Sequence, residues 1–199
     1  MSPGWPVVLQ HGAVGARPLR RRDARTWARL RADNAEWLGP WEATLPREGG
    51  PAATSYVGMI STLRRRARRG QAMPFALTWQ GEMVGLLTVN GITWGSARWA
   101  NMGYWVAKSH AGRSITPTAV ALVTDHLLTT TGLHRVEIAI RPENAASLRV
   151  VEKLGFTEIG LAPGFLHIAG SWRDHRVFQM LAEDARDGLV SRLAPVSPA

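Results

Sequence analysis

Cysteine is absent from this sequence of 199 residues, and lysine is scarce. Without a thiol the chain can form no disulfide and has no cysteine nucleophile, which fits a cytoplasmic location. Lys108 and Lys153 are the only lysines, so arginine supplies almost all of the 24 basic residues behind the formal net charge of +9. Such a charge indicates an anionic partner: a nucleic acid, an acidic protein or a phosphorylated cofactor.

Long hydrophobic runs are also missing. The longest, Ala119 to Val123, is too short to cross a bilayer, so we expect no membrane contact, and residues 1–12 lack the basic start of a secretory signal. The composition, 45% hydrophobic and 20% charged, is typical of a globular protein. We expect a single domain over 1–182 and a mobile tail over 183–199, where the hydrophobic pattern ends in prolines.

Hydrophobic periodicity predicts strands and helices in an α/β (α+β mixed) order, with helices covering a central mixed, mostly antiparallel sheet. Turn residues divide the three middle strands into an antiparallel meander. An irregular stretch rich in glycine and proline, 36–51, separates the first two helices. We expect strands at 13–19, 73–79, 83–94, 98–107, 136–140, 156–168 and 172–181, and helices at 23–35, 54–69, 117–130 and 144–154.

The segment 109–117 joins a predicted strand to a predicted helix and contains small and hydroxyl residues. Free N–H groups at such a junction, with the positive end of the helix dipole, can bind a pyrophosphate. We expect Thr116 to be the N-cap and Pro117 the first helical residue. A plain strand-to-helix turn is the alternative interpretation.

Two segments resemble the GNAT family of acetyltransferases. Met102 to Ala119 is similar to the GNAT strand ending in Tyr-Trp-Val and the following Arg/Gln-x-x-Gly-x-Gly/Ala loop, although Ala111, Ser114 and Thr116 replace three residues of that loop. Residues 144–156 resemble the Asn-x-x-Ser…Glu-Lys-x-Gly-Phe pattern. The resemblance implies a GNAT fold that binds acetyl-CoA, without a metal, through Tyr104, Trp105, Val106, Ala107, Gly112, Arg113, Ser114, Ile115, Thr116, Asn144 and Ser147.

Asn144 and Ser147 are three residues apart at the start of one predicted helix and so face the same way. The resemblance implies that they hold the pantetheine arm, and that Ser147 gives a proton to the departing sulfur. Alternatively, Asn144 is only an N-cap and Ser147 a polar residue of the first turn.

Residues 34–42 and 170–175 resemble the RimJ branch of GNAT enzymes, the ribosomal-protein-alanine acetyltransferases. This implies a protein N-terminus as the acceptor, Trp37 and Trp41 as walls of its cleft, and Glu42 facing the amine. Core packing for a tryptophan and a structural ion pair for Glu42 are the alternatives. The arginine-rich run 64–69 could contact the ribosome or RNA, or be a solvated helix face.

No motif selects the general base, for which Glu42, Glu82, Glu143, Glu158, His167 and Asp174 are all candidates. An α-amine needs little help from a base, because its pKa of about 7.7–8.0 leaves part of it neutral at neutral pH. Two alternatives remain open: a GNAT enzyme for a small-molecule amine or lysine, and a binding protein that has lost catalysis.

Overall fold

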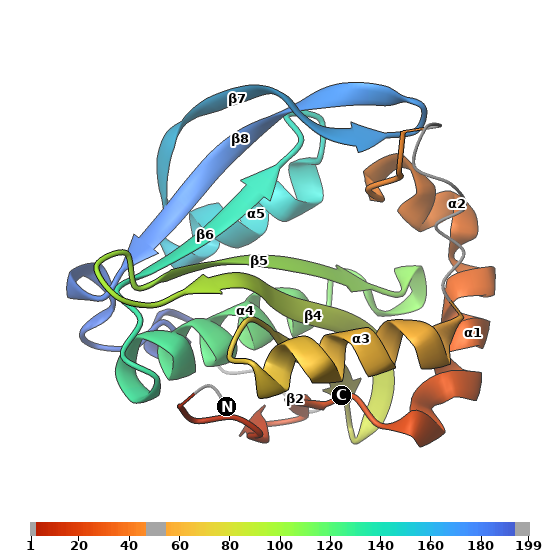
Figure 1. Cartoon of the computed structure of the whole chain (residues 1–199), viewed down its shortest axis with the longest axis horizontal. Coiled ribbons are helices and arrows are strands. Elements are labelled where there is room, and N and C mark those ends of the chain that lie inside the picture. Colours follow the sequence, from red (N-terminus) through yellow and green to blue (C-terminus); the bar gives the residue numbers. More distant parts are fainter. Residues whose placement is uncertain (1–2, 47–54, 194–199) are drawn as a thin grey trace.

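The computed structural model describes residues 3–46 and 55–193 (Figure 1). Its strands are β1 (Leu9–His11), β2 (Val14–Pro18), β3 (Met73–Trp79), β4 (Glu82–Thr93), β5 (Trp99–Val106), β6 (Arg135–Ile140), β7 (Thr157–Ile168) and β8 (Ser171–Leu181). They form one sheet in the order β1-β2-β3-β4-β5-β6-β8-β7. Only β5 and β6 run parallel within this sheet of described residues. The predicted mixed, mostly antiparallel sheet is confirmed.

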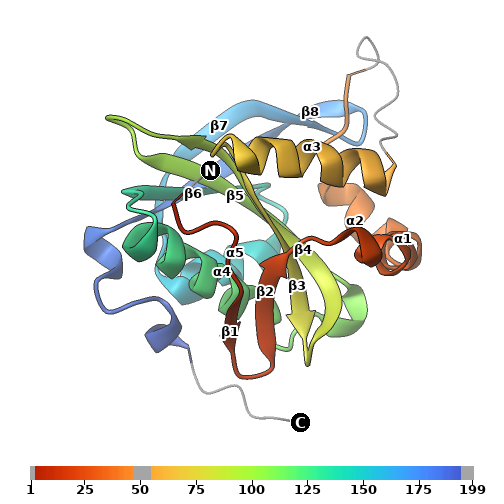
Figure 2. The same ribbon diagram turned by 60° about the horizontal axis from the view of Figure 1, so that its bottom comes forward.

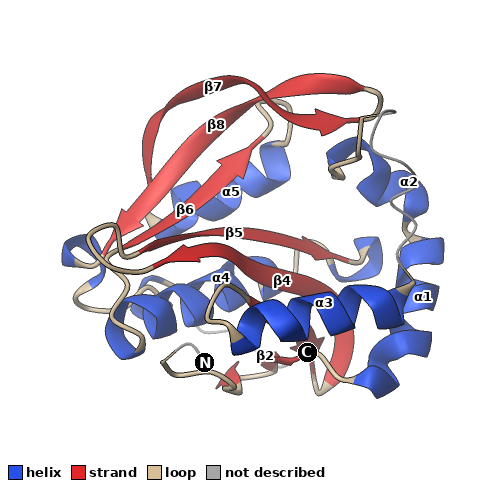
Figure 3. Ribbon diagram, in the orientation of Figure 1, coloured by secondary structure: helices blue, strands red, loops and turns tan. Residues whose placement is uncertain are grey.

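Helices cover both faces of the sheet (Figures 2 and 3). Alternate residues of a strand point to opposite faces, so each face has its own apolar cluster. Ala76 and Met83 pack against the first and third helices, whereas Leu77 and Val84 belong to the core beneath the fourth and fifth. The α-helices are α1 (Ala24–Asp33), α2 (Ala35–Leu38), α3 (Tyr56–Arg68), α4 (Ile115–Asp125) and α5 (Ala145–Leu154).

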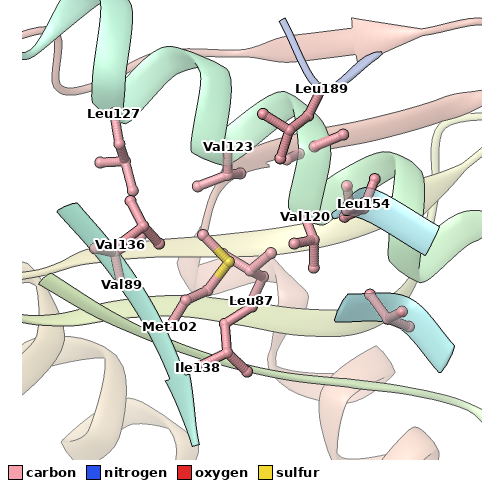
Figure 4. Packing of buried hydrophobic residues seen from close by; sticks show 14 of the residues in the cluster. Leu87, Val89, Met102, Val120, Val123, Leu127, Val136, Ile138, Leu154 and Leu189 are labelled. Atoms are coloured by element: carbon pink, nitrogen blue, oxygen red, sulfur yellow. The ribbon is translucent and has the colours of Figure 1, made fainter. Parts of the chain in front are cut away.

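The larger core fixes α4 and α5 against the centre of the sheet. Val120 and Val123 of α4 are fully buried close to Leu87 of β4 and Met102 of β5 (Figure 4). Each such side chain contributes roughly 1.5–3 kcal/mol by leaving water. This packing holds the N-terminal ends of both helices in place beside β5.

Strands β5 and β6 pair over only three positions, from Trp99 opposite Arg135 to Asn101 opposite Glu137. Beyond them the two strands diverge (Figure 1). Residues 102–106 of β5 consequently have no strand partner on that side within the described sheet. Apart from the Val106 carbonyl, which accepts a hydrogen bond from the Trp37 indole, the backbone groups on that side lack a strand partner and can bind a ligand.

Helix α4 starts two residues earlier than the sequence predicts. It begins at Ile115, so Thr116 is not the N-cap and Pro117 is the third helical residue. Gly112 and Ser114 adopt left-handed conformations, with φ of 79° and 57°, which turn the chain into the helix sooner. Proline is tolerated at this position because the first N–H groups of a helix have no helical partner. A π-helical turn, His126–Thr130, continues the helix to its predicted end.

The predicted mobile tail is wrong for residues 183–193, which pack on α4. Ala185 and Leu189 are buried, and the Asp125 carboxylate accepts hydrogen bonds from the Leu189 and Val190 N–H groups at 2.7 and 3.1 Å. Arg192 donates to the Leu154 carbonyl at 2.7 Å. The rest of the predicted tail, 194–199, lies outside the described residues.

The other differences concern short elements. The three-residue strand β1 has too little alternation to be predicted. Helix α3 begins at Tyr56, and the Ser55 side chain caps it by accepting a hydrogen bond from the Gly58 N–H at 3.2 Å. The predicted start at residue 54 lies outside the described residues, as do residues 47–51 of the irregular stretch. Among the helices described, none has the length and apolar character needed to span a membrane.

Candidate active site

A cavity of about 560 Å³ opens where β5 leaves β6. Its walls come from the end of β5, the loop before α4, the start of α5 and the segment after α1. The wall residues are therefore widely separated in sequence, and they include apolar side chains such as Trp37, Leu38 and Val106. Such a concave site with a few convergent polar groups is the usual form of a ligand pocket.

The N-terminus of α4 supplies one end of this cavity. Gly112, Ser114, Ile115 and Thr116 line it, and the first turn of α4 points unpaired N–H groups toward it. His110, Arg149 and Lys153 add basic side chains to the same lining. Burial lowers the pKa of His110, and the nearby Arg113 charge lowers it further. The arrangement suits a phosphate-bearing ligand.

The start of α5 forms the opposite wall. Asn144 caps this helix by accepting from the Ser147 N–H at 3.1 Å, so the N-cap interpretation of Asn144 is correct. Both residues also line the cavity, and the two interpretations of Asn144 are compatible. Gly155, with φ of 72°, ends the helix as predicted.

Tyr104 belongs to β5, and its side chain lies beside Ser147 of α5. The Tyr104 residue as a whole is partly exposed, but its hydroxyl is buried and has no hydrogen-bond partner among the described residues. Burial raises the pKa of Tyr104 strongly, while the adjacent Ser147 side chain lowers it slightly. The phenol is thus neutral at physiological pH. A buried polar group without a partner costs stability, and a ligand atom beside it would remove that cost.

A second cavity, of about 210 Å³, adjoins the first. Trp41, Tyr104, Asn144 and Ser147 line both, so the two cavities meet at these side chains. The second cavity is completed by residues from the diverging part of β5, from β6 and the position directly after it, and from β7 and β8, namely Met102, Gly103, Ile138, Ala139, Ile140, Arg141, Leu166 and His175.

The segment after α1 is fixed to the site by hydrogen bonds. The Trp37 indole N–H donates to the Val106 carbonyl at 3.2 Å, and Arg141 donates to the Pro40 carbonyl at 2.7 Å. The Arg141 guanidinium also lies 5.4 Å from the centre of the Trp41 ring. Both tryptophans line the cavity, Trp37 from the α-helix α2 and Trp41 from the 3₁₀ turn Gly39–Trp41.

The structure brings most of the predicted site residues together. Three do not line either cavity: Ala107, Arg113 and Glu42. Glu42 forms an ion pair with Arg31, whose guanidinium lies between the Trp27 and Trp105 rings at 5.8 and 5.9 Å. The predicted residues on the cavity walls are Trp37, Trp41, Tyr104, Trp105, Val106, Gly112, Ser114, Ile115, Thr116, Asn144 and Ser147.

Sequence reasoning missed several wall residues. Arg149 and Lys153 continue the four-residue spacing that begins at the lining residue Ala145, so the pattern of α5 could have placed them on the cavity side. Arg141 and His175 have no such spacing; His175 lies in the 170–175 segment that resembles the RimJ branch, but that resemblance did not single it out as a wall residue. They reach the second cavity only because β6 and β8 pair antiparallel, which sets Ile140 opposite Arg176.

Comparison with known proteins identifies the fold. Mycobacterium smegmatis RimJ, solved in complex with CoA-disulfide, is 40% identical and superposes with a TM-score of 0.89, covering 97% of this chain and 96% of that one. The [ribosomal protein uS5]-alanine N-acetyltransferase of Escherichia coli (strain K12) is 25% identical over 92% of this chain and 94% of its own length. The probable N-acetyltransferase YjcK of Bacillus subtilis (strain 168) is 27% identical over 89% and 98%. Residues 14–157 match the acetyltransferase (GNAT) domain, and the chain belongs to this family.

Proposed function

We propose that this acetyltransferase moves an acetyl group from acetyl-CoA to the N-terminal α-amine of a ribosomal protein in the cytoplasm. The observation that carries the proposal is the meeting of two cavities at Tyr104, Asn144 and Ser147. The larger cavity would hold the cofactor and the smaller one the acceptor amine, so that transfer takes place at their junction.

The lining of the larger cavity supports acetyl-CoA as the donor. The pyrophosphate would be bound by backbone N–H groups of residues 112–116 at the start of α4, with Arg149 and Lys153 nearby. The pantetheine arm would lie along Tyr104 to Val106, where β5 has no partner strand on the side facing β6. M. smegmatis RimJ is named as a CoA complex, which agrees with this assignment.

Transfer needs positioning, stabilisation of the carbonyl oxygen and a proton for sulfur. The neutral amine attacks the thioester carbonyl carbon while a backbone N–H of β5 polarises its oxygen. The carbon–sulfur bond then breaks, and Ser147 delivers a proton to the thiolate. The buried Tyr104 hydroxyl lies beside Ser147 and is proposed to orient it.

The acceptor proposal rests on the relatives and on the smaller cavity. The E. coli relative is named for acetylating an alanine of ribosomal protein uS5. A cavity of about 210 Å³ has room for a small first residue, not for a bulky one. Trp41 lines both cavities, and Trp37 lines only the larger one. Both are proposed as walls of the path by which the acceptor reaches the junction, and Glu42 as a charge that attracts the cationic N-terminus from outside the cavities.

The experiment is a thiol-release assay with acetyl-CoA against peptides that differ in their first residue, together with free lysine and small amines. Peptides starting with alanine or serine should be the best acceptors. Calorimetry should show that Asn144→Ala combined with Gly112→Asp raises the dissociation constant of acetyl-CoA at least tenfold. Preference for a small amine would favour the alternative GNAT activity, and binding without thiol release would favour a non-catalytic protein.

A contact with ribosomal RNA is proposed for the outer face of α3. Arg64, Arg65 and Arg68 are exposed there, and Arg69 follows directly. None of these side chains forms an ion pair with another described residue. Clustered free guanidinium groups attract phosphate and accelerate association.

A further inference from the structure

His175 of β8 is a buried ionisable residue that faces the smaller cavity. Only 3% of its surface is exposed, and that cavity is the one proposed above for the acceptor amine. Its neighbour Asp174 points to the opposite face of the strand, because successive side chains alternate. There the Asp174 carboxylate accepts a hydrogen bond from the Gly164 N–H at 2.8 Å, which fixes the irregular part of β7.

Few groups around this cavity can exchange a proton near neutral pH. Of the described residues lining it, three are ionisable: Tyr104, Arg141 and His175. Burial keeps Tyr104 protonated, and arginine remains a cation. Neither Glu42 nor Asp174 lines the cavity. His175 is therefore the one side chain in this lining with the chemistry of a base.

The hydrogen bond of His175 defines which nitrogen is free. Nδ1 lies 3.1 Å from the Arg173 carbonyl oxygen, which can only accept, so Nδ1 carries the proton. In the neutral ring, Nε2 then keeps its lone pair. Among the described residues Nε2 has no hydrogen-bond partner.

The surroundings favour the neutral ring. Burial is the largest influence on the pKa of His175 and lowers it, and the charge of Arg141 lowers it further. The hydrogen bond to the Arg173 carbonyl and the charges of Glu143 and Asp174 raise it. The net effect is a lowered pKa. The Phe165 ring, 5.3 Å away centre to centre, adds apolar contact. A neutral imidazole is ready to receive a proton.

We propose that Nε2 of His175 is the base that takes a proton from the acceptor ammonium group in the smaller cavity. This inference rests on the proposed function. One ammonium proton moves to Nε2 and later to solvent, which leaves a neutral amine with its lone pair. The nitrogen–carbon bond forms and the carbon–sulfur bond breaks. The second proton leaves nitrogen as the amide forms and passes to Ser147, where it replaces the proton that Ser147 gives to sulfur.

The test compares the pH dependence of kcat/KM for the best N-terminal peptide in the wild type, His175→Gln and His175→Asn. Gln removes the base, and Asn removes it while keeping a donor placed for the Arg173 carbonyl. Both should lose about 10²-fold at pH 6.5, which is typical of a lost acid–base group. The loss should shrink to a few-fold at pH 9.5, where the α-amine is already neutral.

Binding and a matched control separate catalysis from folding. The dissociation constant of acetyl-CoA should stay within twofold in both variants. His134→Gln makes the same change at the far end of β6, beside Glu183, and should leave kcat/KM unchanged at every pH. Glu42→Gln tests the competing base: loss of an attracting charge should raise the KM for the peptide, whereas kcat at saturating peptide should stay unchanged at every pH.

Equal kcat/KM in wild type and both His175 variants across this range would overturn the proposal, as would a loss of kcat at saturating peptide that recovers at high pH in Glu42→Gln alone. Nitrogen NMR of the wild type provides a measurement that does not depend on how a variant folds. At pH 7.5 the His175 ring should be neutral and protonated at Nδ1. An imidazolium at that pH would also overturn the proposal. If the wild type acetylated small amines but no peptide, the proposed acceptor would fail while the NMR result still tested His175.

Discussion

The side-chain oxygen of Asn34 accepts a hydrogen bond from the backbone N–H of Lys108 at 2.7 Å, across 74 residues of sequence. The Asn34 amide also donates to the Leu30 carbonyl at 2.8 Å, and the side chain is buried. One residue thus ties the end of α1 to the loop that leads from β5 into α4. Asn34 thus holds the segment with Trp37 and Trp41, the proposed wall of the acceptor path, against the loop proposed to bind the pyrophosphate.

Asn34→Ala should loosen both halves of the site. Two partners, the Lys108 N–H and the Leu30 carbonyl, would lose their hydrogen bond, at a cost of roughly 1–3 kcal/mol in the free energy of unfolding. We expect kcat/KM for the peptide to fall more than acetyl-CoA affinity does, because catalysis needs the two walls in register. Denaturant unfolding and steady-state kinetics measure these effects. Unaltered kinetics with reduced stability would limit Asn34 to folding.

Gly85→Ala in β4 should distort β5, the strand proposed to hold the pantetheine arm. A Cβ at Gly85 would lie 2.2 Å from the Trp105 carbonyl oxygen and 3.0 Å from the Val106 Cα, so β5 must move. Overpacking of this kind costs about 1–3 kcal/mol. Calorimetry should find weaker acetyl-CoA binding and a lower unfolding temperature. Gly39→Ala is the matched control for the unfolding temperature, since its Cβ meets no atom within 4 Å.

Ser147→Ala should reduce turnover by about 10²-fold with little change in acetyl-CoA affinity, because its proposed proton transfer acts as charge develops on sulfur. The Ser147 N–H that Asn144 caps is a backbone group and is retained. Single-turnover kinetics report the chemical step directly. A wild-type rate would remove the Ser147 hydroxyl from the mechanism.

Acidification should destabilise the protein partly through His126. Burial lowers the pKa of His126, although its hydrogen bond to the Gly4 carbonyl at 3.0 Å partly opposes this. Above the ordinary pKa of about 6.5 the ring is neutral in both states and contributes nothing. Below it the unfolded chain binds a proton that the folded ring resists, so stability falls as pH falls. The decline between pH 7 and 5 should be smaller in His126→Gln, and an equal decline would contradict this.

Replacing Arg64, Arg65 and Arg68 together by Gln should flatten the salt dependence of binding to ribosomal particles or RNA, because each phosphate contact contributes about one unit to that slope. Peptide acetylation should stay unchanged, since α3 lines neither cavity. An identical salt slope would leave these arginines as a solvated helix face.

The sequence predicted the sheet, the longer helices and most of the residues that line the larger cavity because these depend on local periodicity and on one contiguous motif each. Gly155 and the alternation of Val136, Ile138 and Ile140 are local signals, and the structure agrees with them. The start of α4 was mispredicted because the left-handed conformation of Ser114 has no sequence signature as strong as glycine's.

The second cavity could not be predicted, since it depends on long-range pairing. His175 reaches it through the β6–β8 register and the irregular stretch of β7 between Ala162 and Leu166. Likewise, burial of Leu189 depends on two hydrogen bonds to Asp125, 64 and 65 residues earlier. Neither relationship leaves a periodic trace in the sequence.

The four side chains shared by the two cavities have a thermodynamic consequence. Trp41 and Tyr104 can adopt only one arrangement at a time, so a ligand that fixes them for one cavity also sets the shape of the other. With donor and acceptor placed as proposed, their affinities are linked, and linkage is reciprocal: the factor by which bound donor changes acceptor affinity equals the factor by which bound acceptor changes donor affinity. The proposed assignment thus makes the shared wall the element through which the two ligands are coupled.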